Sequence, residues 1–467
     1  MWWKRAVLVP ILLWYAANPY LSPDSYWYLT AAQAIRTNTW RENYVWNRTP
    51  GYPAFIAVMS WFSDRYLLEV VALAQIILVI WTLSRLRVQV LKNQFEVIRR
   101  DQLRKALNFS YVISFVLLGG YMTALLPQAV FTVVLTWQVI QYFKIQNESK
   151  MSIKNAFVFL FIVSISYLVH PILAISSIIS LLLHLTSKLN DDRALNRQQI
   201  YKIGLVSLTG VSLFVGLHIF WSGIAQENAS IQVQRRKEQS FQTSNDSTVS
   251  SNNDSTVSSK KNDNPSESEK YVSDILEKQR VLKRNALVTD PLFTQSIIQP
   301  ILENPVPIIS NFPKLFFINM IGSPNSGPNV SIGFYRMYSG VRTCVVMPTA
   351  VVLSTSNGLL SNLKYRCKSP YQLSTSGVYD SIFKAVYLIS WIIGIGLLLR
   401  LTQKMLFGEL NRLRVCLIPL GFIGVYAALQ ASENRYGAPA LPLLLMFGSG
   451  LSNSKNLKLR NKKRVLQ

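Results

Sequence analysis

An aspartate that follows the first apolar segment is the residue of this chain best placed to do chemistry. Residues 22–29 read Ser-Pro-Asp-Ser-Tyr-Trp-Tyr-Leu, with Asp24 in third place. A carboxylate near a membrane surface can act as a general base, because partial desolvation and neighbouring groups adjust its affinity for protons. Asp24 also suits a helix N-cap, since Leu29, Ala32 and Ile35 keep helical spacing after it. Asp24 is therefore our candidate base, with helix capping as the competing interpretation.

Three residues that can carry positive charge lie where they could bind a phosphate. Arg48 opens the sequence Arg-Thr-Pro-Gly-Tyr-Pro, whose prolines and glycine predict a turn. Arg435 precedes the last apolar run, and His170 stands before a proline between two apolar runs. Arginine fits phosphate well, because its planar fork donates two hydrogen bonds at once. In the competing interpretations, Arg435 pairs with Glu433 or snorkels to the interface, and His170 caps a helix end.

The composition indicates lipid as the main solvent of the chain. Of its 467 residues, 50% are hydrophobic and 15% charged, the mean hydropathy is +0.22, and the formal net charge is +25. A soluble nucleic-acid-binding protein with this basic excess would carry more charge overall, so we expect no nucleic-acid partner. The sequence predicts an all-α polytopic membrane protein with about ten transmembrane helices. The apolar runs are residues 6–20, 67–83, 107–126, 127–143, 156–169, 171–185, 203–221, 382–399, 415–429 and 437–451.

The distribution of Lys and Arg predicts how these spans are oriented. Basic residues concentrate in the connection 84–105 and in the tail after residue 451, which the positive-inside rule places in the cytoplasm. Both termini then lie in the cytoplasm, and we expect an integral protein of the cell (inner) membrane. The connections between spans alternate between the two sides of the membrane as required only if residues 50–62 do not cross it. We therefore expect an exterior interfacial helix over 54–62. Residues 6–20 are interpreted as an anchor, because no small-residue cleavage site follows them.

Four regions follow from this topology. Residues 1–220 form an N-terminal membrane module whose first exterior loop is 21–66, and residues 222–380 form one large exterior loop. The polar repeats at about 240–268 predict disorder, and a small cap follows them. In that cap Cys344 and Cys367 either form a disulfide, as suits an oxidising exterior, or remain two buried thiols. Residues 381–452 hold the C-terminal membrane helices, and 453–467 form a basic cytoplasmic tail.

The order of these motifs resembles the GT-C glycosyltransferases, in the bacterial branch related to protein O-mannosyltransferases and the aminoarabinose transferase of lipid A. The similarity covers residues 1–220 and 380–451, and includes the Arg-Tyr-x-x-Pro-x-x-Pro pattern that begins at Arg435. It implies an inverting transfer of a sugar from a polyprenyl-phosphate donor to a lipid, glycan or protein hydroxyl at the outer face. Asp24 matches the family's first-loop aspartate, which is understood to deprotonate the acceptor.

Sugar transfer from a lipid phosphate needs a base on one face of C1 and cationic help for the leaving phosphate on the other. Arg48, His170 and Arg435 are the candidates to bind the donor phosphate. Among the aromatic residues near the entrance we single out Tyr26 and Tyr52 as pocket walls. An interfacial aromatic belt is the competing interpretation for both.

The chain departs from the family pattern at positions where many members carry acidic residues. It has Ser25 beside the first-loop aspartate, and Thr123 and Gln128 at the outer ends of the third and fourth spans. A divalent ion bridging two carboxylates thus has little support, so we expect a metal-independent or weakly metal-dependent site, with no metal ligand and no cofactor assigned. Three further acidic residues on the exterior side could supply the base in place of Asp24, or be solvated surface charges: Glu42, Asp64 and Glu69.

Two other functions remain open. An O-antigen polymerase or ligase also combines many spans with one large exterior loop, and would depend on loop arginines such as Arg336, Arg342 or Arg366. A transporter or flippase is the other, although we find no repeat between the halves of the kind that transporters often show.

Overall fold

The computed structural model describes twelve stretches of the chain, and every structural statement below concerns these alone: residues 23–39, 49–93, 100–123, 125–147, 153–189, 201, 204–221, 223–224, 306–321, 377–407, 414–428 and 437–450. Within them the regular structure is entirely helical. The predicted first span 6–20, the disorder predicted at 240–268, Cys344, Cys367 and the tail 453–467 lie outside the described residues.

Most of the described helices coincide with the predicted apolar runs. Their bounds are α3 (Pro23–Arg36), α5 (Gly51–Ser60), α6 (Leu67–Asn93), α7 (Arg100–Thr123), α8 (Gln128–Asn147), α9 (Ile153–Val169), α10 (Pro171–Leu189), α14 (Val306–Ile321), α18 (Gly377–Phe407), α20 (Leu417–Ala428) and α22 (Leu441–Gly450), with a 3₁₀ turn η3 (Arg414–Cys416) before α20. A further helix covers Gly204–Trp221. Helices α3, α5 and α14 lie outside the predicted runs. The all-helical prediction is confirmed for the described residues.

Three helical segments are long and apolar enough to cross a membrane: Leu67–Lys92, Gly204–Trp221 and Leu388–Leu406. Other apolar helices are shorter than the ~20 residues that a perpendicular crossing requires, such as α20 with 12 residues and α22 with 10. The ten spans thus stay a prediction, while three helices of membrane-spanning length are established in the described part.

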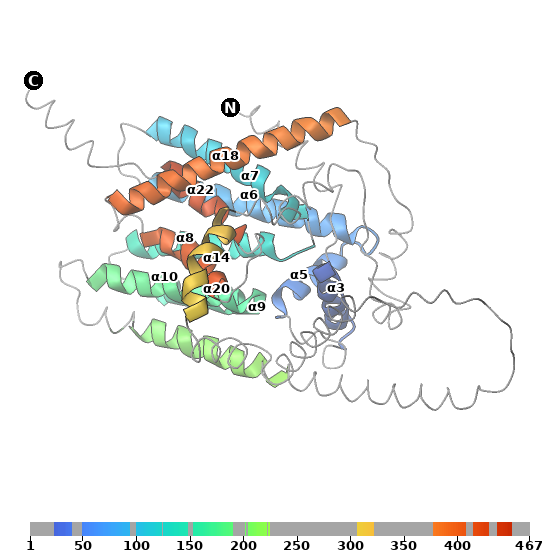
Figure 1. Cartoon of the computed structure of the whole chain (residues 1–467). Helices are drawn as coiled ribbons and strands as arrows, with labels where there is room; N and C mark the ends of the chain where they lie inside the picture. The colour runs from blue at the N-terminus through green and yellow to red at the C-terminus, as the bar shows by residue number, and fades with distance from the viewer. Residues whose placement is uncertain are drawn as a thin grey trace, which may run out of the picture.

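The helices pack into a bundle around one large apolar core. Neighbours along the chain lie side by side, as α9 and α10 do, and α22 returns to pack against α7 and α18 (Figure 1). The contact between α18 and α22 is close because Gly448 has no side chain. A Cβ there would collide with the carbonyl oxygen of Leu397. Main-chain contact of this kind is typical of helix pairs joined through small residues.

One helix of the predicted exterior loop belongs to this bundle. The Pro-containing run that forms α14 packs against α20, and Figure 1 shows it crossing the direction of α10 and α18. Rings of Phe312 and Phe316 lie 3.8 and 3.9 Å from the position that a Cβ on Gly424 would occupy. The sequence predicted short apolar runs in a cap here, and the structure shows that one of them covers the bundle.

Large apolar side chains point outward along the helices. On Gly204–Trp221 four of them, Leu205, Leu208, Ile219 and Phe220, are each 65% exposed. On α18, Ile392 and Leu399 are 57% and 61% exposed. Apolar surfaces of this extent are costly in water and stable against lipid or another protein.

Candidate functional site

The first-loop helices α3 and α5 sit together at one end of the bundle (Figure 1). Tyr28 and Leu29 of α3 pack with Ile56 of α5 and with Leu67 and Leu125, which lie at the ends of the longer helices. This apolar contact surface positions α3, because a 14-residue helix is marginal without tertiary packing.

A buried hydrogen bond anchors the first turn of α3, the turn that contains Asp24. The hydroxyl of Ser25 donates to the backbone carbonyl of Leu125 at 2.9 Å, and Ser25 is fully buried. Pro23 opens the helix, so Asp24 lies inside its first turn and not at the capping position. The side chains of Asp24 and Tyr26 lie outside the described residues, so the structure positions their backbone only.

The segment that follows Arg48 is pressed against the break between α9 and α10. The hydroxyl of Thr49 donates to the carbonyl of Val169 at 2.9 Å. A Cβ on Gly51 would lie 2.7 Å from the backbone carbon and oxygen of Leu168, closer than real contacts allow. Only glycine therefore fits at residue 51. Arg48 itself lies outside the described residues.

His170 lies at the same break and joins three helices. Its Nδ1 accepts a hydrogen bond from the backbone N–H of Ile172 at 3.3 Å, which caps the start of α10. Its ring lies 5.2 Å from the ring of Phe131 on α8 and 6.0 Å from that of Tyr426 on α20. His170 thus caps an N–H group of a helix start, whereas the competing interpretation from the sequence was a cap of carbonyl groups at a helix end. Because Nδ1 accepts this bond, the proton of the neutral ring is carried by Nε2.

Tyr52 is a packing residue in this structure. Its side chain is 0% exposed, and its ring meets that of Tyr28 edge-on at 5.0 Å. Its hydroxyl donates to Oε1 of Gln75 at 3.1 Å, and Nε2 of Gln75 donates to the carbonyl of Met122 at 2.9 Å. Burial, and secondarily the nearby Tyr28, raises the pKa of Tyr52 well above its ordinary value. A pocket wall needs an exposed face, which Tyr52 lacks; the hydrogen-bond chain instead ties α5 to α6 and α7.

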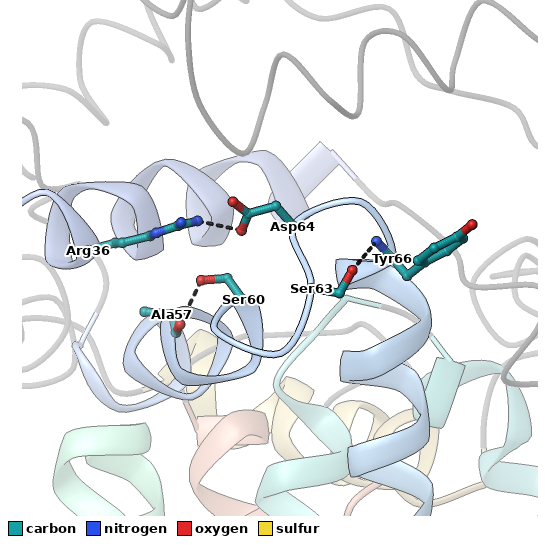
Figure 2. Close-up of polar contacts among 6 residues, drawn as sticks. All are labelled: Arg36, Ala57, Ser60, Ser63, Asp64 and Tyr66. Atoms are coloured by element: carbon teal, nitrogen blue, oxygen red, sulfur yellow. Dashed lines mark hydrogen bonds and ion pairs between the residues drawn. The ribbon is translucent and has the colours of Figure 1, made fainter.

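Asp64, one of the exterior acidic residues predicted from the sequence, forms an ion pair with Arg36 at the end of α3 (Figure 2). In the same turn Ser60 donates to the carbonyl of Ala57, and the hydroxyl of Ser63 accepts the N–H of Tyr66. These contacts fix the connection between α5 and α6, and give Asp64 a structural partner. Glu69 lies in the first turn of α6, and Glu42 lies outside the described residues.

The residue after Arg435 and Tyr436 is in main-chain contact with α14. A Cβ on Gly437 would collide with the backbone carbonyl of Asn319, so this residue lies directly against the main chain of α14. Arg435 lies outside the described residues. No pattern in the sequence indicates that α14 would meet this motif, because contacts between segments so far apart follow from the packed bundle.

Gln128 stands out in the sequence only as a departure from a family pattern, whereas the structure makes it a candidate binding group. It lies in the first turn of α8 and is 4% exposed. Within the described part of the chain its Oε1 accepts no hydrogen bond. An unsatisfied buried amide costs about 1–3 kcal/mol, which a bound polar group would recover. The local signal, a glutamine at the start of an apolar helix, is too common to single it out.

No three His, Cys, Asp or Glu side chains gather into a metal-binding group anywhere in the described residues. The expectation of a site without metal or cofactor stays a prediction.

Comparison with known proteins identifies no relative: no family model, no curated protein and no solved structure matches the chain.

Proposed function

We propose that this chain is an integral membrane glycosyltransferase of the GT-C type. It would move a sugar from a polyprenyl-phosphate donor to a lipid, glycan or protein hydroxyl at the outer face of the membrane. The observation that carries this proposal is the meeting of separate segments at one end of the bundle. The turn that contains Asp24 is bonded to Leu125, and the turn after Arg48 is bonded to Val169, beside His170.

The proposed reaction is an inverting displacement at C1 of the sugar. Asp24 takes the proton of the acceptor hydroxyl as the oxygen forms its bond to C1. The bond between C1 and the phosphate oxygen breaks on the opposite face, and the polyprenyl phosphate leaves with its electron pair. The His170 imidazole and the guanidinium groups of Arg48 and Arg435 would stabilise that leaving charge, and Gln128 would bind a polar group of a substrate.

The membrane placement of about ten spans, with both termini in the cytoplasm of an inner membrane, belongs to the same proposal. Three helices of spanning length and the outward apolar side chains support it. Basic residues of the described part gather at the end away from α3, as Arg87, Lys404 and Arg414 do, and these side chains are those that the positive-inside rule assigns to the cytoplasm. The site would then face the outer side, where a prenyl-linked donor arrives by diffusion in the lipid.

The test of the assignment is Asp24→Asn, with Asp64→Asn as the matched control. Both remove one negative charge from the first loop at constant size. Transfer of radiolabelled sugar from a polyprenyl-phosphate donor by the purified protein should be lost in Asp24→Asn and retained in Asp64→Asn. The unfolding midpoint in detergent should be unchanged in Asp24→Asn and at most slightly lower in Asp64→Asn, which loses a partly exposed ion pair with Arg36. Undiminished transfer by Asp24→Asn would remove Asp24 from the mechanism, and loss in Asp64→Asn alone would move the base to Asp64.

A further inference from the structure

A surface shared by α6 and α8, which the proposed sugar transfer does not use, combines two tryptophan rings with two cations. Trp81 of α6 and Trp137 of α8 lie with their ring centroids 5.4 Å apart. The guanidinium carbon of Arg85 lies 5.8 Å from the centroid of the Trp81 ring, and Nζ of Lys144 lies 6.0 Å from that of the Trp137 ring. We call these four residues the tryptophan–cation cluster, because the three contacts join them into one surface.

The tryptophan–cation cluster faces outward and carries positive charge. Trp81 is 44% exposed, Arg85 and Lys144 are exposed, and Trp137 is half-buried. Cation–π attraction of about 0.5–1 kcal/mol holds a cation over an exposed ring but does not neutralise it. Within the part of the chain that the structure describes, neither Arg85 nor Lys144 forms an ion pair or a hydrogen bond. An anion can therefore bind both side chains without displacing an acidic residue.

An apolar stripe leads from the cluster along α6 toward the end where α3 lies. Leu73, Ile77 and Trp81 follow one another at intervals of four residues, so they share one face of the helix. They are 42%, 55% and 44% exposed. At 1.5 Å per residue the stripe is about 12 Å long, close to the roughly 15 Å of hydrocarbon in one leaflet of a bilayer. It can therefore pack against an acyl chain whose headgroup lies at the level of Arg85.

The depth of the two cations corresponds to a membrane interface. Helix α6 begins at Leu67, which packs with α3, and α8 begins shortly after Leu125, which packs there too. Arg85 and Lys144 lie about 27 and 24 Å along these helices from their first residues. A hydrocarbon core is about 30 Å thick, so the cations and α3 belong to opposite faces of the membrane. Tryptophan and basic side chains are typical of the boundary between hydrocarbon and headgroups.

We propose that the tryptophan–cation cluster binds an anionic phospholipid of the leaflet opposite α3. The lipid phosphate accepts hydrogen bonds from the Arg85 guanidinium and the Lys144 ammonium, and an acyl chain lies along Leu73 and Ile77. A free phosphate would use the cations but leave the stripe uncovered, and a zwitterionic lipid would bring a cation of its own toward them. This site rests on the membrane placement proposed above and is independent of the sugar transfer.

The experiment measures the thermal unfolding midpoint of the whole purified chain in an uncharged maltoside detergent. Phosphatidylglycerol, phosphatidylcholine and inorganic phosphate are titrated separately. A ligand that binds the folded state raises the midpoint as its concentration rises. We expect phosphatidylglycerol to raise the midpoint more than phosphatidylcholine does. Equal shifts with the two lipids would show that headgroup charge is not recognised, and an equal shift with inorganic phosphate would show that the site takes the free anion; either result overturns the proposal.

Variants separate this site from general attraction between a basic protein and an acidic lipid. Arg85→Gln and Lys144→Gln should each weaken the apparent affinity for phosphatidylglycerol about fivefold or more. The matched control is Arg400→Gln, which removes an exposed arginine from α18 and should leave the affinity unchanged. If Arg85→Gln and Arg400→Gln weaken it equally, the attraction is nonspecific and the proposal fails.

Trp81→Leu tests the ring apart from the charges. It keeps an apolar side chain on the stripe but removes the aromatic face beneath Arg85, so the shift caused by phosphatidylglycerol should become smaller. A structural role alone would lower the lipid-free midpoint and leave that shift unchanged, and this result would contradict the cluster. Asp24→Asn should retain the full lipid response, so a failure of the lipid site and a failure of the proposed sugar transfer are measured separately.

Discussion

Replacing Gly51 by alanine should pull the first loop away from the bundle. The added Cβ would lie 2.7 Å from backbone atoms of Leu168, and ordinary contact begins at 3.4 Å, so the two segments must separate by about 0.7 Å. The neighbouring hydrogen bond from Thr49 to Val169 is 2.9 Å long and would stretch to about 3.6 Å, beyond hydrogen-bond range. The atoms nearest to the added Cβ belong to the backbone and not to the flexible end of a side chain. Rotation of a side chain therefore cannot relieve the overlap, and the two segments must move apart.

The expected loss of stability has two parts. Overpacking against fixed backbone costs about 1–3 kcal/mol, and the lost hydrogen bond adds about 1 kcal/mol. Thr49→Val removes the hydrogen bond alone and should account for the smaller part. Because Arg48 is covalently attached to Thr49, a displacement of this size should also lower sugar transfer, by up to about a hundredfold.

The assay compares unfolding midpoints and sugar-transfer rates of Gly51→Ala with those of Gly396→Ala. Gly396 lies on α18 with no atom within 4 Å of its added Cβ, so the control tests the same chemical change without a clash. It should be neutral or slightly stabilising, since alanine favours a helix over glycine. Equal midpoints and equal rates in the two variants would refute the close packing of residue 51 against α9.

Other variants test single contacts at the same end. Gln128→Leu should raise the unfolding midpoint, because it removes an unsatisfied buried amide, and lower sugar transfer; a lower midpoint would show that the amide has a partner. Ser25→Ala should cost about 1 kcal/mol of stability and reduce transfer more than the control Ser63→Ala does. Tyr52→Phe should cost about 1 kcal/mol at neutral pH by removing the hydrogen bond to Oε1 of Gln75. Because the pKa of Tyr52 is raised in the folded state, its neutral phenol favours folding below the ordinary value of 10.0, and wild-type stability falls above it. The deficit of Tyr52→Phe should therefore shrink in alkaline denaturation profiles, and a constant deficit would contradict the burial of the phenol.

The positions of the helices could be predicted from the sequence because each described apolar run is continuous and bounded by polar or basic residues. The short helix near residues 54–62 was predicted as well, and it begins at Gly51, three residues early. Pro53 explains the difference, since a proline is tolerated in the first turn of a helix and does not end it there. The presence of a helix can thus be predicted from the local pattern of apolar residues. Its first and last residues depend in addition on the conformation at the helix ends.

Tertiary contacts were not predictable in the same way. The sequence predicted Tyr52 as a pocket wall, with an interfacial belt as the competing interpretation, and neither describes its buried side chain. Its burial follows from tertiary packing that brings Tyr28 and Gln75 against it from two other helices. The ion pair of Asp64 with Arg36 could not be predicted from the sequence either. Arg36 is distant along the chain and comes close to Asp64 only when α3 and α5 pack together.

The buried polar groups at the α3 end constrain where each part of the substrates can bind. Ser25, Thr49 and Gln75 have hydrogen-bond partners within the protein, whereas Oε1 of Gln128 accepts no hydrogen bond from the described residues. An amide oxygen attracts a donor such as a sugar hydroxyl, and it is repelled by phosphate oxygens, which are acceptors too. In the proposed reaction the donor phosphate must therefore be bound by the arginines and His170, while Gln128 faces a hydroxyl group of a substrate.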